Sequence, residues 1–134
     1  MKRFLILAVL LASCQMKMLD SSQTIRAYDK DYDRVYSSIV SFCAINGIPI
    51  ILSDKQSGII STAYSSNFYD VGWQLRHPIK YSFTIVAKEK STIVYSTLYM
   101  SSGEQTDKMD EDVYLPIYSK MFDGISELLR DGNL

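Results

Sequence analysis

Two cysteines and one histidine are the residues of this 134-residue chain that could pair as a nucleophile and its base. Nucleophilic catalysis by a thiol requires a base within hydrogen-bonding reach, which makes Cys43 with His77 the pair to consider. Cys43, however, falls on the apolar stripe of an expected helix, where a free cysteine behaves as a small hydrophobic residue. We therefore expect Cys43 to be structural and His77, next to Pro78, to be non-catalytic.

The remaining side chains match no catalytic or metal-binding motif. The chain contains no nucleophile elbow, zinc-protease helix, P-loop or dinucleotide-binding glycine pattern. The alternating acids of residues 29–33 resemble the start of a calcium loop, but that loop requires glycine and glutamate where this chain has Arg34 and Val40. A single histidine without a cysteine pair does not form a zinc site. We expect no catalytic residue, no metal and no cofactor, and predict that the protein is not an enzyme.

The N-terminus has the pattern of a secretory signal. Lys2 and Arg3 precede an apolar run at residues 4–11, and small residues follow the run. The run is far shorter than the roughly 20 residues that a membrane-spanning helix requires. Residues 1–13 are therefore predicted to form a signal peptide that is removed from the mature protein.

The end of this segment, Leu11-Ala12-Ser13-Cys14, resembles the lipobox of bacterial lipoprotein precursors. The resemblance implies cleavage between Ser13 and Cys14, and lipidation of Cys14 by a diacylglycerol on its sulfur and, in many bacteria, an acyl chain such as palmitate on its amine. Gln15 replaces the aspartate that retains such proteins at the inner membrane, which implies the periplasmic face of the outer membrane. The alternative is a soluble secreted protein in which Cys14 is incidental.

Composition indicates one globular domain and argues against a nucleic-acid partner. Hydrophobic residues make up 47% of the chain and charged residues 22%, as in ordinary soluble domains. Fourteen basic against fifteen acidic residues give a net charge of −1, which becomes about −3 once Lys2 and Arg3 leave with the signal peptide. Without a basic excess, we expect no nucleic-acid partner. Cys43 has no second free cysteine to pair with beside the lipidated Cys14, so no disulfide is expected.

Hydrophobic periodicity predicts a single α+β domain at residues 24–134, preceded by a polar, flexible tether at residues 14–23. Single apolar stripes predict helices at residues 29–47 and 112–130. Alternation and β-branched residues predict five strands, at residues 24–28, 48–53, 59–65, 79–88 and 92–100. The order β-α-β-β-β-β-α predicts an antiparallel sheet with two helices packed on one face.

Gly124 stands in the middle of the second expected helix, where glycine costs roughly 1 kcal/mol relative to alanine. Apart from close packing, the sequence offers no reason for this residue.

An irregular segment at residues 66–78 contains the aromatic residues Phe68, Tyr69 and Trp73. Aromatic residues on loops are over-represented at the centres of protein interfaces, which makes these three candidates for binding a partner. The alternative is that the segment folds back over the open sheet or over one end of the core.

Part of the sequence resembles the helix-grip domains of the outer-membrane-assembly lipoprotein family (the NlpB/DapX type). The resembling stretch is residues 32–62. It contains Tyr-Asp-Arg-Val-Tyr, an apolar helix, Asn46-Gly47-Ile48 and the hairpin pattern S-D-x-x-x-G-x-I-x-T. Members of that family have two such domains, whereas this chain has room for one. The resemblance implies an accessory, protein-binding role without catalytic residues.

These observations favour a lipid-anchored lipoprotein of the cell envelope. In the leading hypothesis it is a non-catalytic accessory module that binds an envelope protein in an outer-membrane assembly or transport complex. The alternative is a periplasmic protein that binds a small apolar or lipid ligand between helices and sheet. A third possibility is an envelope structural protein without a defined ligand.

Replacing the predicted lipidation site tests the anchor. We expect Cys14→Ala to abolish palmitate labelling and to move the protein from the membrane to the soluble fraction, because each buried methylene of an acyl chain contributes about 0.8 kcal/mol to membrane binding. The measurement is labelling of growing cells with radioactive palmitate, followed by fractionation. A wild type that takes up no label, together with a variant that still fractionates with membranes, contradicts the prediction.

Overall fold

The computed structural model describes residues 19–66, 78–101 and 111–131, except for the side chains of residues 111–113. The fold is α+β, which confirms the predicted fold class. The described elements, in chain order, are α2 (Ser21–Thr24), β1 (Ile25–Tyr28), α3 (Tyr32–Ile45), β2 (Ile50–Asp54), β3 (Ile59–Thr62), β4 (Ile79–Ala87), β5 (Thr92–Met100) and α4 (Glu111–Arg130). The four-residue helix α2 is an addition to the predicted order.

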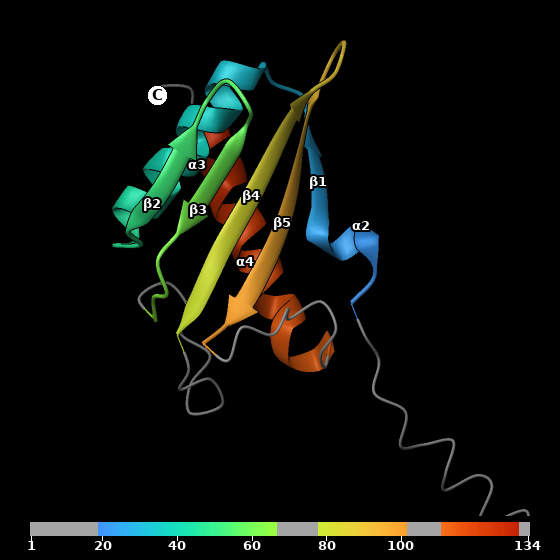
Figure 1. Ribbon diagram of the computed structural model, residues 1–134. Helices are drawn as coiled ribbons and strands as arrows, with labels where there is room; N and C mark the ends of the chain where they lie inside the picture. The colour runs from blue at the N-terminus through green and yellow to red at the C-terminus, as the bar shows by residue number, and fades with distance from the viewer. Residues whose placement is uncertain (1–18, 67–77, 102–110, 132–134) are drawn as a thin grey trace, which may run out of the picture.

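Five strands form one antiparallel sheet in the order β1-β5-β4-β3-β2 (Figure 1). Its centre is the β4–β5 hairpin, in which nine residue pairs run from Ile79↔Met100 to Ala87↔Thr92. The connection through α3 carries the chain from β1 at one edge of the sheet to β2 at the other. The strands that flank α3 in sequence are therefore the two edge strands.

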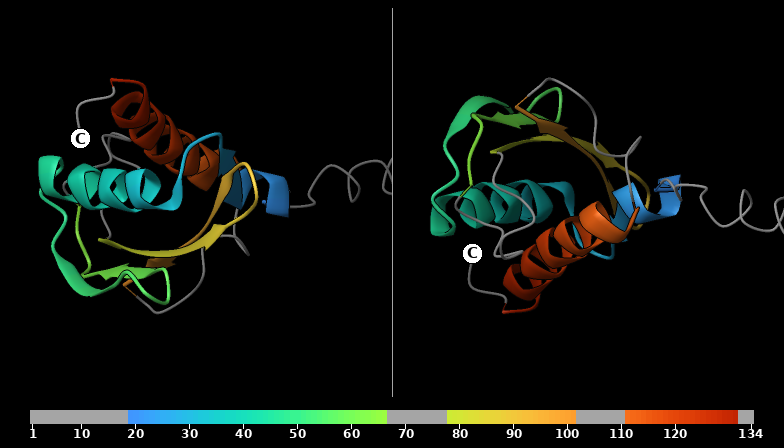
Figure 2. Two further views of the ribbon diagram at one scale, coloured as in Figure 1. Left: turned by 90° about the horizontal axis from the view of Figure 1, so that it is seen from above. Right: turned by 90° about the horizontal axis from the view of Figure 1, so that it is seen from below.

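Both long helices, α3 and α4, cover the same face of the sheet, as Figure 2 shows in two views, which confirms the predicted packing. The sheet curves around this helix layer. Strand alternation directs one set of residues from β4 and β5 toward the helices. On β4 this set is fully or almost fully buried, and it comprises Ile79, Tyr81, Phe83 and Ile85.

Helix α3 begins at an N-cap aspartate, Asp31, whose carboxylate accepts a hydrogen bond of 2.9 Å from the backbone N–H of Arg34. It ends before Gly47, whose φ of 65° is suited to glycine. Its buried surface is wider than the predicted single stripe, because Ser38 and Phe42 are also buried. The cause is α4, which packs beside α3 and covers a second side of it.

The turn between β2 and β3 is fitted tightly against the sheet at Gly58. This residue has a φ of 77°, and a Cβ atom there would lie 2.2 Å from the backbone oxygen of Ile85. The Ile85 N–H donates a 2.8 Å hydrogen bond to the Gly58 oxygen, and the Tyr32 hydroxyl donates a 2.6 Å bond to the Lys55 oxygen. Only glycine fits both the backbone conformation and the space at this position.

The domain starts earlier than predicted. Leu19 is only 8% exposed and belongs to the hydrophobic core. Asp20 then caps α2 in a reciprocal arrangement, in which its carboxylate accepts the Ser22 N–H at 2.9 Å and the Gln23 side chain accepts the Asp20 N–H at 2.8 Å. The expectation of a flexible tether at residues 14–23 is therefore wrong from residue 19 onward, because Leu19 belongs to the core and α2 is ordered, although α2 itself has no buried residue.

Strand β1 is fixed to α4 by three polar contacts. Arg26 Nη1 lies 2.8 Å from Asp123 Oδ1, and its guanidinium lies 5.0 Å from the centre of the Phe122 ring. The Tyr28 hydroxyl donates a 3.0 Å hydrogen bond to the Phe122 oxygen. These contacts hold the N-terminal edge of the sheet on the helix layer.

Close packing accounts for Gly124. A Cβ atom at this position would lie 2.9 Å from Cε2 and 3.2 Å from Cδ2 of Phe42. Phe42 is 2% exposed, so its ring is packed on nearly all sides. The glycine therefore lets α4 approach α3 at the Phe42 ring, which offsets its low helix propensity.

We expect Gly124→Ala to lower the free energy of unfolding. The overpacking cost of about 1–3 kcal/mol outweighs the gain in helix propensity of about 1 kcal/mol. The measurement is urea unfolding of the variant in two backgrounds, with Phe42 intact and with Phe42→Leu. In the Phe42→Leu background the alanine should be neutral or stabilising, because the clashing ring is gone. An equal loss of stability in both backgrounds contradicts this account.

Candidate functional site

The structure does not place the residues that the sequence singled out for lipidation and partner binding. They lie outside the described residues, in the segments 1–18 and 67–77, and they are Ser13, Cys14, Phe68, Tyr69 and Trp73. His77 also lies in the second segment. The lipidation site and the aromatic cluster stay predictions.

Cys43 lies in the core, as its helical spacing predicts. Its side chain is fully buried and free of any disulfide. Burial raises the pKa of its thiol from 9.0 to about 12, which keeps the thiol protonated and unreactive at neutral pH. Within the described part of the chain, no three carboxylate, histidine or cysteine side chains gather in a way that could hold a metal ion.

Within the described residues, no helix covers the face of the sheet opposite α3 and α4, which we call the open face. Along β4 and β5 it consists of the residues that alternate with the buried set. Residues of the other strands belong to this face where they pair with these residues. Its members are Ile25, Ala27, Leu52, Asp54, Ile59, Ser61, Lys80, Ser82, Thr84, Val86, Ile93, Tyr95, Thr97 and Tyr99.

The composition of the open face is unusual for a surface exposed to water, because its charged residues are Lys80 and Asp54 alone. Apolar, aromatic and hydroxyl side chains make up the rest. Tyr95 is 40% exposed. The Lys80 ammonium lies 6.0 Å from the centre of the Tyr99 ring on the neighbouring strand. Uncovered surfaces with large apolar side chains mark sites of interaction more often than surfaces rich in charge.

The β2 edge (Ile50–Asp54) is the second exposed apolar feature. Strand β2 pairs with β3 on one side, and no strand of the described residues pairs with its other side. The register shifts between Ile50 and Leu52, which leaves Ile51 as an extra residue without a partner on β3. Such bulges re-aim side chains. Here Ile51 is 64% exposed and Leu52 is 52% exposed.

The apolar surface of the β2 edge extends toward the helix layer. Ile45, the last residue of α3, is 69% exposed just before the connection to β2. Residues 48–53 read Ile-Pro-Ile-Ile-Leu-Ser and contain no charge. The sequence predicted this strand but not its exposure, since an apolar strand is usual in a sheet interior. The uncharged run was the signal available, but only the strand order identifies it as an edge.

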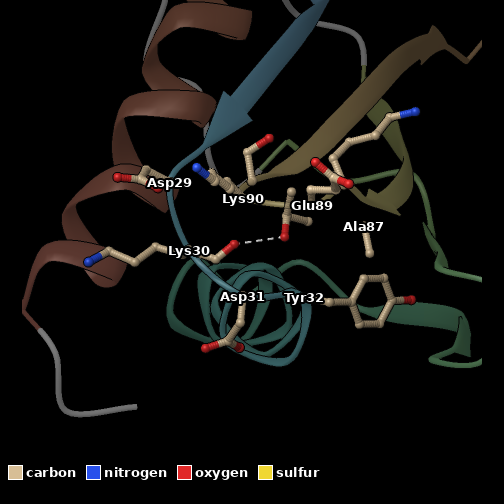
Figure 3. A pocket seen from close by; sticks show the side chains of 10 residues that line it. Asp29, Lys30, Asp31, Tyr32, Ala87, Glu89 and Lys90 are labelled. Carbon is tan, nitrogen blue, oxygen red and sulfur yellow. Dashed lines mark hydrogen bonds between the residues drawn. The ribbon is translucent and has the colours of Figure 1, made fainter.

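A hollow of about 370 Å³ lies between the connection of β1 to α3 and the turn of β4 to β5. Three lysines and three acidic residues line it, so their charges cancel. Figure 3 shows Lys30, Asp31 and Tyr32 pointing in three different directions. The hydrogen bond in its wall joins Thr92 Oγ1 to the Lys30 backbone oxygen at 2.8 Å. The side chains do not converge on a point, so this hollow lacks the arrangement of a specific ligand site.

A larger hollow, of about 640 Å³, is an open groove between α3 and α4. Phe42, Ile45 and Leu128 supply its apolar part, and charged residues of α4 such as Asp123 and Glu127 lie along it. It lies within the helix layer, not between the helices and the sheet. The region between the layers is filled by fully buried side chains, among them Tyr81, Phe83, Tyr118 and Met121.

No protein-family model matches the chain, and no curated protein matches it either. The resemblance of residues 32–62 to helix-grip lipoprotein domains therefore stays a prediction. Among the helices of the described residues, none has both the length and the apolar composition needed to cross a bilayer.

Burial of two ionisable groups predicts a loss of stability in alkali. In the folded protein burial raises the pKa of Cys43 from 9.0 to about 12 and that of Tyr28 from 10.0 to about 12. The unfolded chain releases these protons earlier, so their contribution to stability is complete below pH 9 and is lost as the pH rises toward 12. We expect the free energy of unfolding, measured by urea titration, to fall over this range.

Single substitutions separate the contributions of Cys43 and Tyr28 to this loss of stability. Cys43→Val should remove the part of the fall that begins at pH 9, whereas Tyr28→Phe should change the curve only above pH 10. A Cys43→Val protein whose stability falls as steeply as that of the wild type between pH 9 and 10 contradicts the assignment to Cys43.

Proposed function

We propose that this protein is a lipid-anchored accessory module of the bacterial cell envelope, which binds another envelope protein through the β2 edge. The anchor is Cys14, at the end of a signal sequence that resembles a lipobox. The protein acts without catalysis, on the periplasmic side of the outer membrane. Its partner belongs to an outer-membrane assembly or transport complex.

The observation that carries this proposal is the exposed apolar edge at Ile51 and Leu52. A strand edge with unpaired backbone groups is a template for association, and natural proteins usually protect such edges. Here Pro49 and the bulge at Ile51 limit continued pairing by another copy, yet Ile51 and Leu52 remain 64% and 52% exposed. Large apolar side chains kept on the surface of a well-packed domain support a role in binding a protein.

The alternative, a small apolar or lipid ligand held between helices and sheet, has weaker support. Neither hollow described above lies between the two layers. The buried residues of α4 and β5 meet there, where the Leu98 N–H donates a 3.0 Å hydrogen bond to the Tyr118 hydroxyl, and buried aromatic side chains such as Tyr81 and Tyr118 fill the space. A ligand in this region would have to displace side chains that are fully buried.

Charge substitutions at the edge test the proposal. We expect Ile51→Lys with Leu52→Lys to abolish recovery of a stoichiometric membrane protein that co-purifies with the wild type, because the partner's apolar surface would meet two charges. The measurement is cross-linked co-purification of the full-length, lipidated protein from native membranes, read by mass spectrometry. Phe68→Ala, Tyr69→Ala and Trp73→Ala in one chain test the aromatic segment in parallel.

The matched control places lysine on α3, at Ser37 and Ala44, which are exposed like the β2 edge. This control should leave recovery unchanged and should fold like the double lysine variant, as judged by urea unfolding. Equal recovery with the edge variant and the wild type contradicts binding through β2. Recovery of lipid without any protein favours the ligand alternative.

A further inference from the structure

The point where the chain leaves the folded domain limits how a lipid-anchored form can lie on a membrane. Leu19 is buried, and the residues after it are fixed by α2 and by the pairing of Ile25 with Tyr95. Only residues 15–18 separate Leu19 from Cys14. Five Cα–Cα steps span at most about 18 Å. An anchor at Cys14 therefore holds the β1–β5 side of the domain against the bilayer surface.

Charge distinguishes the two surfaces that could face the lipid from this position. The helix layer presents exposed charges of both signs on α4 and beyond its end. Acids stand at Asp123, which is paired with Arg26, and at Glu127 and Asp131, and basic residues stand at Lys120 and Arg130. The open face near β5 presents Lys80 as its charged residue, because Asp54 lies at the opposite, β2 side of the sheet. A bilayer with anionic lipids attracts basic side chains and repels acidic ones. The part of the open face near β5 has one basic and no acidic side chain, whereas α4 carries exposed acids, so this part of the open face is the surface better suited to lipid.

The side chains around Lys80 fit the same environment. Tyr95 and Tyr99 lie on the open face of β5, and Tyr95 pairs with Ile25, the first residue after α2. Tyrosine is enriched where membrane meets water, because its ring is apolar and its hydroxyl is polar. Lysine can extend its ammonium to the headgroups while its methylenes stay in apolar surroundings. Lys80 lies 6.0 Å from the centre of the Tyr99 ring.

We propose that the open face rests on the bilayer surface through Tyr95, Tyr99 and Lys80. This inference depends on the anchor at Cys14 from the proposed function, but not on the identity of the protein partner. The sheet curves around the helix layer, so the β2 edge, including Leu52, is set back from the part of the open face at Tyr95, Tyr99 and Lys80, roughly 19 Å from β1 across four strand spacings. One side of the sheet is held by the anchor and the other side is free to meet a partner.

Site-specific fluorescence tests this orientation. The full-length protein, with its acylation at Cys14 verified by intact mass, is reconstituted into vesicles of phosphatidylethanolamine and phosphatidylglycerol. An environment-sensitive dye is attached at Thr84→Cys, next to Tyr95 on the open face, or at Glu127→Cys on α4 as the matched control. Cys43 is buried and stays unlabelled. We expect a blue shift at position 84 and quenching by spin-labelled lipids, and neither effect at position 127.

Two substitutions, on β4 and on the turn after it, test whether the positive charge of Lys80 contributes to binding of anionic lipid. Lys80→Gln should reduce the blue shift at position 84 to the value seen in vesicles without phosphatidylglycerol, whereas Lys88→Gln, at the other end of the strand, should not. A lack of quenching at position 84 in the acylated protein, or stronger quenching at position 127, overturns the orientation and leaves the open face for a protein partner. A chain without acyl mass instead contradicts the anchor, and with it both the proposed function and this inference.

Discussion

The one-sided burial of the sheet is the constraint on which the rest of the structure depends. Alternate residues of β4 and β5 bring a row of large side chains to one face, and the nine residue pairs of the hairpin keep them aligned. Two amphipathic helices are needed to cover that row, and both lie on the same side. No described helix covers the opposite face, which makes the composition of that face the first clue to how the protein interacts.

Small clearances set the packing within the helix layer and within the sheet. Helix α4 approaches α3 closely because Gly124 leaves room for the Phe42 ring, and the β2–β3 turn approaches β4 because Gly58 leaves room for the Ile85 carbonyl. At the N-terminal edge of the sheet, polar contacts hold the sheet on the helix layer, because Arg26 and Tyr28 bind β1 to α4. The side chains between the layers therefore fill the interior, and the surfaces with binding potential lie outside it.

Those surfaces have a consistent spatial order. The chain enters the fold at the β1 side, close to Tyr95, whereas the bulge that exposes Ile51 lies at the far side of the sheet. The proposed tether and a face with few charges suit the proposed contact with a membrane near the entry point, and an apolar edge suits the proposed contact with a protein away from it. Both roles use surfaces that one-sided packing leaves uncovered, so neither requires a change in the core.

The sequence alone determined the five strands, the two long helices and the α+β class, because periodicity and turn residues act locally. The strand at 92–100 and the burial of Cys43, for example, followed from spacing. The signal-like segment and Cys14 were also recognised from the sequence, because such motifs are defined by the order of residues and not by the fold. Only the tertiary structure decided that β1 and β2 are edges, that Leu19 belongs to the core, that Gly124 meets Phe42, and that Ile51 is exposed. These facts depend on which segments become neighbours across the sheet, and an apolar residue has the same periodicity whether or not another strand covers it.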